Sequence, residues 1–233
     1  MRTIALTAAL SLALGCGNDD RRPTHIESPM NDSSSDRTIQ LAGDRIIHLP
    51  ENRTLAPTQD GPISIDLTTS QICGLIIHEP EDNVLHVLGR PDVDAAYDIV
   101  PHARKYFYSS HGMCVTLHYG NVHAFQFWLT ADAAKQSLAY DADPNAILDR
   151  IAQEFTPASA TIVRGNHGTL QLRTGLSRKD IESTMGRPDK ATDWPDGGTT
   201  LTYFGSVPDG DYDRLHLDCS MTAGELQSVY LTH

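Results

Sequence analysis

Long apolar segments are scarce in this chain. The longest run of apolar and small residues covers residues 4–14, close to the N-terminus. A helix that crosses the hydrocarbon core of a membrane needs roughly 20 such residues, and no later segment is long enough either. The sequence therefore predicts no transmembrane helix.

Motifs of catalysis and metal binding are also missing. The chain has 4 cysteines and 11 histidines, but it contains no CxxC pair, no HExxH and no HxH. A GxSxG motif is absent as well, and no cysteine is paired with a histidine in a known catalytic motif. We therefore expect a protein that is not an enzyme and has no metal and no cofactor. The alternative, a hydrolase, would require a cleft with strongly perturbed titratable groups.

Basic residues are outnumbered. The chain has 18 lysines and arginines against 30 aspartates and glutamates, which gives a net charge of −12. An acidic surface argues against nucleic acid as a partner and against direct attraction to anionic lipid head groups. This charge favours a soluble surface. If the surface binds a charged partner, that partner is expected to be basic.

The N-terminus has the pattern of a secretory signal peptide: Arg2, the apolar run 4–14, and small residues before the cut. The segment 13–16 (ALGC) resembles the lipobox of bacterial lipoproteins, with its first two residues in swapped order. The resemblance implies that Cys16 carries acyl chains that hold the protein stably on a membrane. Gly17, which follows, implies the outer membrane of the bacterial envelope, facing the periplasm. Ordinary cleavage with an unmodified Cys16 is the alternative.

The residues after the signal peptide (1–15) are not typical of a folded core. Residues 16–37 are polar and charged and contain almost no large apolar side chain, so we predict a disordered tether. Residues 38–60 follow, with two short strands around a turn at 43–44 and then a loop rich in proline.

An internal repeat is the most informative feature of the remaining chain. The segment 89–92 (GRPD) recurs unchanged at 186–189. Three further pairs follow in the same order. They are Tyr106-Phe107 with Tyr203-Phe204, Leu117-His118 with Leu215-His216, and the Gly-x-Val pattern from Gly120 with Gly-x-Leu from Gly224. The pattern predicts two copies, at 61–130 and 159–233, joined by a helical connection at 131–158.

Each copy begins with a short predicted helix. In the second copy Ser177 is a typical N-cap, Asp180 stands three residues on, and Gly186 is placed to end the helix. Three strand-like runs follow in each copy, the last two joined by a short turn. We therefore predict an α+β fold with two tandem copies of a short helical segment packed on a three- to four-stranded antiparallel meander sheet.

This arrangement resembles the group that contains the SmpA/OmlA (BamE) outer-membrane lipoproteins and the β-lactamase inhibitor protein. The matching positions are Gly175-Leu176, Gly186-Arg187-Pro188, Tyr203, Leu215-x-Leu217 and Gly224-x-Leu226, and the copy from Gly74-Leu75 onward repeats them. The resemblance implies a non-catalytic role in protein binding or scaffolding, without naming a partner.

The cysteines allow one disulfide if Cys16 is acylated, because three thiols then remain in an oxidising compartment. Cys73 precedes the first predicted helix and Cys114 lies in the sheet that this helix must cover, so we predict a bond between them. A bond between Cys114 and Cys219 is the alternative.

Strand alternation predicts the binding surface. Phe125, Phe127 and Leu129 share one side of a strand, which leaves Gln126 and Trp128 on the other. The same division in each copy gives six candidate partner-binding residues: Phe107, His118, Trp128, Phe204, His216 and Tyr230. Large aromatic side chains on an exposed sheet are typical of interfaces. The alternative is that a helix at 144–155 covers this side and makes the aromatics part of the core.

These observations favour a periplasm-facing lipoprotein, anchored by lipid, that binds another protein through its sheets as a scaffold or assembly factor. Two alternatives stay open. One is an immunity or inhibitor lipoprotein that blocks a toxin or hydrolase, and the other is a module for a small ligand or lipid. The last would need a deep apolar pocket between helix and sheet.

Overall fold

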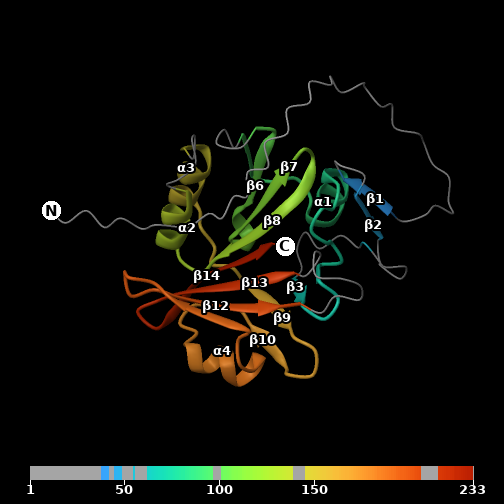
Figure 1. Ribbon diagram of the computed structural model, residues 1–233. Coiled ribbons are helices and arrows are strands. Elements are labelled where there is room, and N and C mark those ends of the chain that lie inside the picture. Colours follow the sequence, from blue (N-terminus) through green and yellow to red (C-terminus); the bar gives the residue numbers. More distant parts are fainter. Residues whose placement is uncertain are drawn as a thin grey trace, which may run out of the picture. The chain divides into compact units, whose positions relative to one another are not determined.

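Figure 1 shows a computed structural model of the chain, which describes residues 38–41, 45–48, 55, 62–96, 101–138, 145–205 and 215–232. The predicted signal peptide, Cys16 and the tether lie outside these residues. The chain divides into two units, residues 1–51 and 52–233. In the first unit β1 (Thr38–Leu41) pairs antiparallel with β2 (Arg45–His48), which confirms the two strands predicted there.

The second unit contains a four-stranded sheet of order β10-β9-β3-β4. Its strands are β3 (Ile63–Asp66), β4 (Gln71–Ile72), β9 (Ala160–Val163) and β10 (Thr169–Gln171). The two inner strands, β3 and β9, run parallel, and each pairs antiparallel with the strand that follows it in the chain. This sheet was not predicted from the sequence.

A larger sheet has eight strands in the order β11-β12-β13-β14-β8-β7-β6-β5, all antiparallel. In its first half lie β5 (Val93–Ala96), β6 (Ala103–Tyr108), β7 (Met113–His118) and β8 (Asn121–Trp128). In its second half lie β11 (Lys190–Asp193), β12 (Thr199–Phe204), β13 (His216–Thr222) and β14 (Glu225–Thr232).

The predicted fold class is therefore wrong. We expected an α+β fold with separate sheets of three or four strands, whereas the described chain is mostly β, with one sheet of eight strands and one of four. The reason is edge pairing. The last strand of each meander would be left with an unpaired edge, and these two edges, β8 and β14, pair with each other instead.

Four α-helices accompany the sheets in the described residues: α1 (Glu81–Leu88), α2 (Ala131–Leu138), α3 (Asn145–Gln153) and α4 (Arg178–Met185). The predicted start of α4 is confirmed, because Ser177 and Asp180 form a reciprocal capping box. The predicted stops are confirmed too. Gly89 and Gly186 follow α1 and α4 with φ 77° each, a conformation that favours glycine.

Two apolar cores lie on opposite sides of the large sheet. The main core joins one side of that sheet to α1, α4 and the four-stranded sheet, with Val84, Phe125, Ile162, Ile181 and Val229 among its members. The second core lies between the first half of the large sheet and the pair α2–α3, visible beside β6 and β8 in Figure 1. The helices therefore cover the two halves of the sheet unequally.

The two halves match each other in detail. The helix caps Pro80 and Ser177 each form a bridge to the first residue of β8 and β14, Asn121 and Glu225. Each hairpin before these strands turns through a residue with φ 52°, Tyr119 or Ala223, followed by glycine. Because β7 and β13 have their register shifts at corresponding places, Thr116/Leu117 and Ser220/Met221, the repeat extends through both hairpins.

The predicted alignment of the repeat needs two corrections. Asp92 N–H donates to Phe107 O, and Asp189 N–H donates to Thr202 O. Tyr203 therefore corresponds to Tyr108, and the predicted match of Tyr106-Phe107 with Tyr203-Phe204 is wrong by two residues. Leu117-His118 corresponds to Met221-Thr222, so the predicted match with Leu215-His216 is also wrong. Dipeptides alone could not show the different loop lengths between the strands.

The pairing of β8 with β14 is symmetric about one residue pair. Counted from Gly120 and Gly224, Gln126 and Tyr230 are equivalent residues, and they lie opposite each other. On either side Val229 pairs with Phe127, and Leu231 with Phe125. The large sheet therefore has approximate two-fold symmetry about the pair Gln126–Tyr230.

Candidate functional site

Two of the six predicted binding residues are buried. Trp128 and Phe107 are both 0% exposed, and their ring centroids lie 5.9 Å apart. They pack in the second core against Ala134, Leu138, Ile147 and Ile151 of α2 and α3. The prediction that Trp128 and Phe107 contact a partner is wrong, because α2 and α3 cover them. The alternative, in which a helix at 144–155 covers this side of the sheet, describes α3. Their side of the strand was predicted correctly.

On the side of the large sheet that carries Trp128 and Phe107, the second half has less helical cover than the first. The helices α2 and α3 contact β5, β8 and β14. Beyond these helices, the side chains that point away from the main core are half-buried, apart from Thr202, which is 9% exposed. These residues, which we name the Tyr230 face, are Thr200, Thr202, Phe204, His216, Asp218, Ser220, Ser228 and Tyr230. Three predicted binding residues, Phe204, His216 and Tyr230, belong to this face.

Polar and aromatic contacts order the Tyr230 face. The Thr202 hydroxyl donates to Asp218 Oδ1 over 2.6 Å, and the Phe204 and His216 rings lie 4.7 Å apart. Tyr230 lies between Asp218 and Gln126 on the neighbouring strands. The Asp218 carboxylate and the His216 ring thus contact neighbouring side chains of the same face. The Tyr230 face is therefore an ordered surface of hydroxyl groups and aromatic rings.

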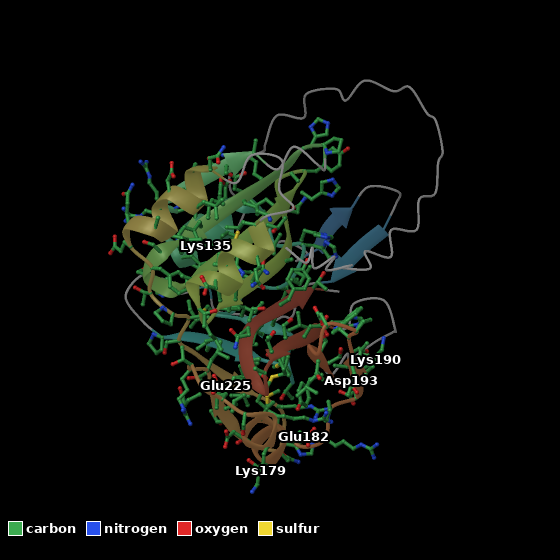
Figure 2. The ribbon with its side chains drawn as sticks, turned by 90° about the vertical axis from the view of Figure 1, so that its left-hand side faces the viewer. Lys135, Lys179, Glu182, Lys190, Asp193 and Glu225 are labelled. Atoms are coloured by element: carbon green, nitrogen blue, oxygen red, sulfur yellow. The ribbon has the colours of Figure 1, made fainter. Side chains whose placement is uncertain are left out.

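Trp194 extends this face and was missed in the sequence. It follows β11 in the turn to β12, is 39% exposed, and its indole N–H donates to Thr200 Oγ1 over 2.9 Å. The turn is closed by Trp194 N–H to Gly198 O and by Gly197 N–H to Trp194 O. The turn residues Pro195 to Gly198 directly after Trp194 were a signal that this tryptophan would lie at a surface. Figure 2 shows Lys190 and Asp193 of the same edge strand.

His118, the last predicted binding residue, lies elsewhere. It ends β7, and its ring is 4.5 Å from that of Tyr119, which is 66% exposed and 4.7 Å from His102. The centroid of the His123 ring lies 6.2 Å from that of the His118 ring. Burial, and then the neighbouring His118, lower the pKa of His123 below the usual histidine value. His118 therefore belongs to a histidine–tyrosine group and is not the counterpart of His216.

The predicted disulfide between Cys73 and Cys114 is wrong. All three cysteines of the described residues are buried thiols. Cys73 and Cys219 lie in the main core, whereas Cys114 lies in the second core under α2 and α3. The sheet stands between the two cores, so it also excludes the alternative bond from Cys114 to Cys219. Burial raises the pKa of the Cys219 thiol far above its usual value, which makes it unreactive.

Metal ligands do not converge in the described residues, since no group of three or more His, Cys, Asp or Glu side chains could hold an ion there. Within these same residues no helix is long and apolar enough to cross a membrane. The candidate site of this structure is therefore the Tyr230 face with Trp194 at its edge.

Comparisons with known proteins add little to this description. No family model matches the chain, and no curated protein matches it significantly. Among solved structures it is similar to a cysteine-rich secretory protein from Staphylococcus aureus subsp. aureus Mu50, with 8% sequence identity and a TM-score of 0.26. The match covers 76% of this chain and 46% of that one, so the chain spans less than half of the other protein. A TM-score of this size carries no argument about fold or function.

Proposed function

We propose that this chain is a non-catalytic lipoprotein of the bacterial envelope that binds another protein through the Tyr230 face. The observation that carries the proposal is the unequal cover of one continuous sheet. The first half buries Phe107 and Trp128 under helices, whereas the second half keeps Phe204, His216 and Tyr230 half-exposed.

The chemistry of the face suits a protein partner. Aromatic rings supply large contact areas at low cost in side-chain entropy, and they are enriched at interface centres. Around them Thr200, Ser220 and Ser228 offer hydroxyl groups that can both donate and accept hydrogen bonds. A polar surface of this kind fits a partner that also exists free in solution better than a permanent apolar interface.

The membrane anchor is the second part of the proposal. The lipobox-like segment at 13–16 supports acylation of Cys16, and the polar residues 17–37 supply a linker between the anchor and the folded unit. On this proposal the protein faces the periplasm from the outer membrane and holds its partner there. A scaffold or assembly factor and an inhibitor of a toxin or hydrolase both satisfy this description.

A capture experiment with matched variants tests the binding face. The tagged protein is purified from the envelope of its own host as wild type, as the double variant Trp194→Ala with Tyr230→Ala, and as Tyr119→Ala. Tyr119 is an exposed aromatic residue away from the Tyr230 face, so its variant is the control. We expect the double variant to lose a partner that wild type and control retain, with no large fall in Tm. Retention of every partner by a folded double variant would contradict the proposal.

A further inference from the structure

Arg164 fills a defined corner in the second half of the fold. Its guanidinium donates to the carbonyl oxygens of Met185 (2.8 Å) and Arg187 (3.1 Å) and to Asp189 Oδ2 (2.7 Å). The same group lies 4.9 Å from the centroid of the Tyr203 ring. The corner thus combines carbonyls at the end of α4, one carboxylate and one aromatic face, all of which attract a planar cation.

The first half contains the same corner. Leu88, Arg90, Asp92 and Tyr108 are the counterparts of Met185, Arg187, Asp189 and Tyr203 in the repeat. Two contacts show the correspondence. Tyr108 donates to Gly89 O as Tyr203 does to Gly186 O, and Asp92 Oδ2 accepts Ser109 N–H as Asp189 Oδ2 accepts Phe204 N–H.

A cavity of about 150 Å³ lies at this first corner. All four of these counterparts line it, together with Ser110 and His111. The exposed fractions of the two carboxylates also agree, with 34% for the side chain of Asp92 and 35% for that of Asp189. The walls that hold Arg164 in the second half are therefore repeated around a cavity in the first.

The residue of the first copy that matches Arg164 is not an arginine and does not line this cavity. The parallel strands β3 and β9 pair in register from Ile63 opposite Ala160 to Asp66 opposite Val163. The next residue of β3 is Leu67, and the next residue of β9 is Arg164. Leu67 is buried in the main core, and a Cβ on Gly205, directly after β12, would lie 2.9 Å from its carbonyl oxygen, so Leu67 supplies no charged group to the first corner. There Asp92 pairs with Arg150 of α3, but Arg150 is not among the residues that line the cavity.

We propose that the cavity at Asp92 is a binding site for a guanidinium group, supplied by an arginine side chain of another protein or by a small guanidinium compound. The group would lie against the Tyr108 ring and donate to the carbonyl oxygens of Leu88 and Arg90 and to Asp92. This site uses no residue of the Tyr230 face, and it stands or falls separately from the proposed function.

The existing contacts of Asp92 leave room for this ligand. Asp92 Oδ2 accepts the Ser109 N–H and hydroxyl, and Arg150 Nη2 lies 3.5 Å from Oδ1. A carboxylate has about four acceptor positions, so one stays available on Oδ1. Arg90 adds a positive charge near the site, but its counterpart Arg187 is likewise exposed beside the bound Arg164.

The test is a titration of the purified protein with a blocked tripeptide, acetyl-Gly-Arg-Gly-amide, and with its lysine analogue as the control. Binding is followed by the NMR shift of the Ser109 amide, which contacts Asp92. We expect one site for the arginine peptide, weaker binding of the lysine peptide, and at least about tenfold weaker binding in Asp92→Asn. The matched variant Asp189→Asn should bind as wild type does, because Arg164 already fills that corner.

A second variant tests the repeat directly. Arg164→Ala opens the second corner, so we expect it to bind two arginine peptides where wild type binds one. Equal binding of the arginine and lysine peptides, or binding that Asp92→Asn does not weaken, would overturn the proposal. It would also be overturned if Arg164→Ala gained a site while wild type bound no peptide. Should Arg164→Ala not fold, the comparison of Asp92→Asn with Asp189→Asn decides alone.

Free L-arginine distinguishes the two sources of the guanidinium group. A blocked peptide that binds as tightly as free arginine, or more tightly, supports an arginine side chain of a partner protein. Binding of free arginine that is about tenfold tighter or more supports a small guanidinium compound, because only that ligand has the charged α-amino and carboxyl groups. Either result supports the site, and each names a different occupant.

Discussion

The indole N–H of Trp128 shows how strongly the second core depends on apolar burial. The side chain is fully buried, and its N–H has no acceptor among the described residues. An unpaired buried donor costs about 1–3 kcal/mol, while complete burial of a large apolar side chain contributes about 1.5–3 kcal/mol. Trp128 therefore stabilises the protein through its ring and not through its polar group.

A pair of substitutions tests this balance. We expect Trp128→Ala to lower the free energy of unfolding by about 3–5 kcal/mol, because it leaves a cavity under α2 and α3. Trp128→Phe removes the unpaired N–H as well as part of the ring and should cost much less. Urea denaturation measures both. A Trp128→Ala protein of unchanged stability would show that this residue is not in the core.

The histidine group at the end of β7 and the start of β8 predicts a pH effect of known sign. The pKa of His123 is lowered by burial and by His118. The folded protein therefore resists protonation of His123 more than the unfolded chain does, so this contribution is complete above about pH 6.5 and is lost as the pH falls through the lowered value. Part of the His123 side chain still contacts solvent, and solvent screening keeps the effect on stability small.

NMR titration of the His123 ring tests this interpretation. In wild type the pKa should lie below the usual histidine value of about 6.5. We expect His118→Gln to raise it only in part, because burial is the larger cause. A pKa above the usual value in wild type would contradict the described position of His123.

At the scale of elements, the two short helices of the repeat begin differently. Ser177 caps α4 through its side chain, whereas Pro80 starts α1 with no side-chain cap. We expect Ser177→Ala to cost about 1 kcal/mol of stability, since it leaves an N–H at the start of α4 without its acceptor. Lys179→Ala on the exposed surface of α4, labelled in Figure 2, is the control and should change little. Equal losses in both variants, measured by thermal unfolding, would exclude a specific cap.

The elements also show what the sequence could and could not predict. Local signals were sufficient for α4, because its cap, apolar spacing and final glycine lie within ten residues or so. They were sufficient for the sides of β8 and β14, since Phe125 and Val229 alternate with Gln126 and Tyr230 as expected. Strand pairing was not predictable in the same way, because the pairing of β8 with β14 brings together residues that are far apart in the chain.

The same limit applied to the candidate site. Alternation placed Trp128 and Tyr230 on the same side of the sheet, but it gave no information on which half α2 and α3 would cover. The disulfide prediction failed for a related reason. Cys114 alternates with Met113 and Val115 of the main core, so its strand position already placed it on the side away from that core.

At the scale of the whole molecule, the anchor is the feature that the described residues do not include. We predict that Cys16 is the first residue of the mature protein and carries acyl chains. Mass spectrometry of the protein from bacterial membranes should show the added mass on the N-terminal peptide. A Cys16→Ala variant should then be released from the membrane fraction. A mature N-terminus beyond Cys16 would exclude the anchor.

Approximate two-fold symmetry relates the two halves of the large sheet, and the proposed sites lie where the two copies differ. The pair α2–α3 covers the first half of the large sheet, and the half related to it by symmetry carries the Tyr230 face. Arg164 fills a corner in the second copy of the repeat, and the matching corner in the first copy is a cavity. Duplicated halves that differ at these places could contact different partners without any change in the shared framework.

Site-specific crosslinking in living cells tests protein binding by the Tyr230 face most directly. A photoreactive amino acid replaces Trp194 in one strain and the exposed Tyr119 in another, and each strain is irradiated before the envelope is isolated. We predict a discrete, heavier crosslinked species from position 194 and none of that mass from position 119. The absence of any crosslinked protein at position 194, in a strain whose protein is folded and exported, would contradict the proposed role of this face.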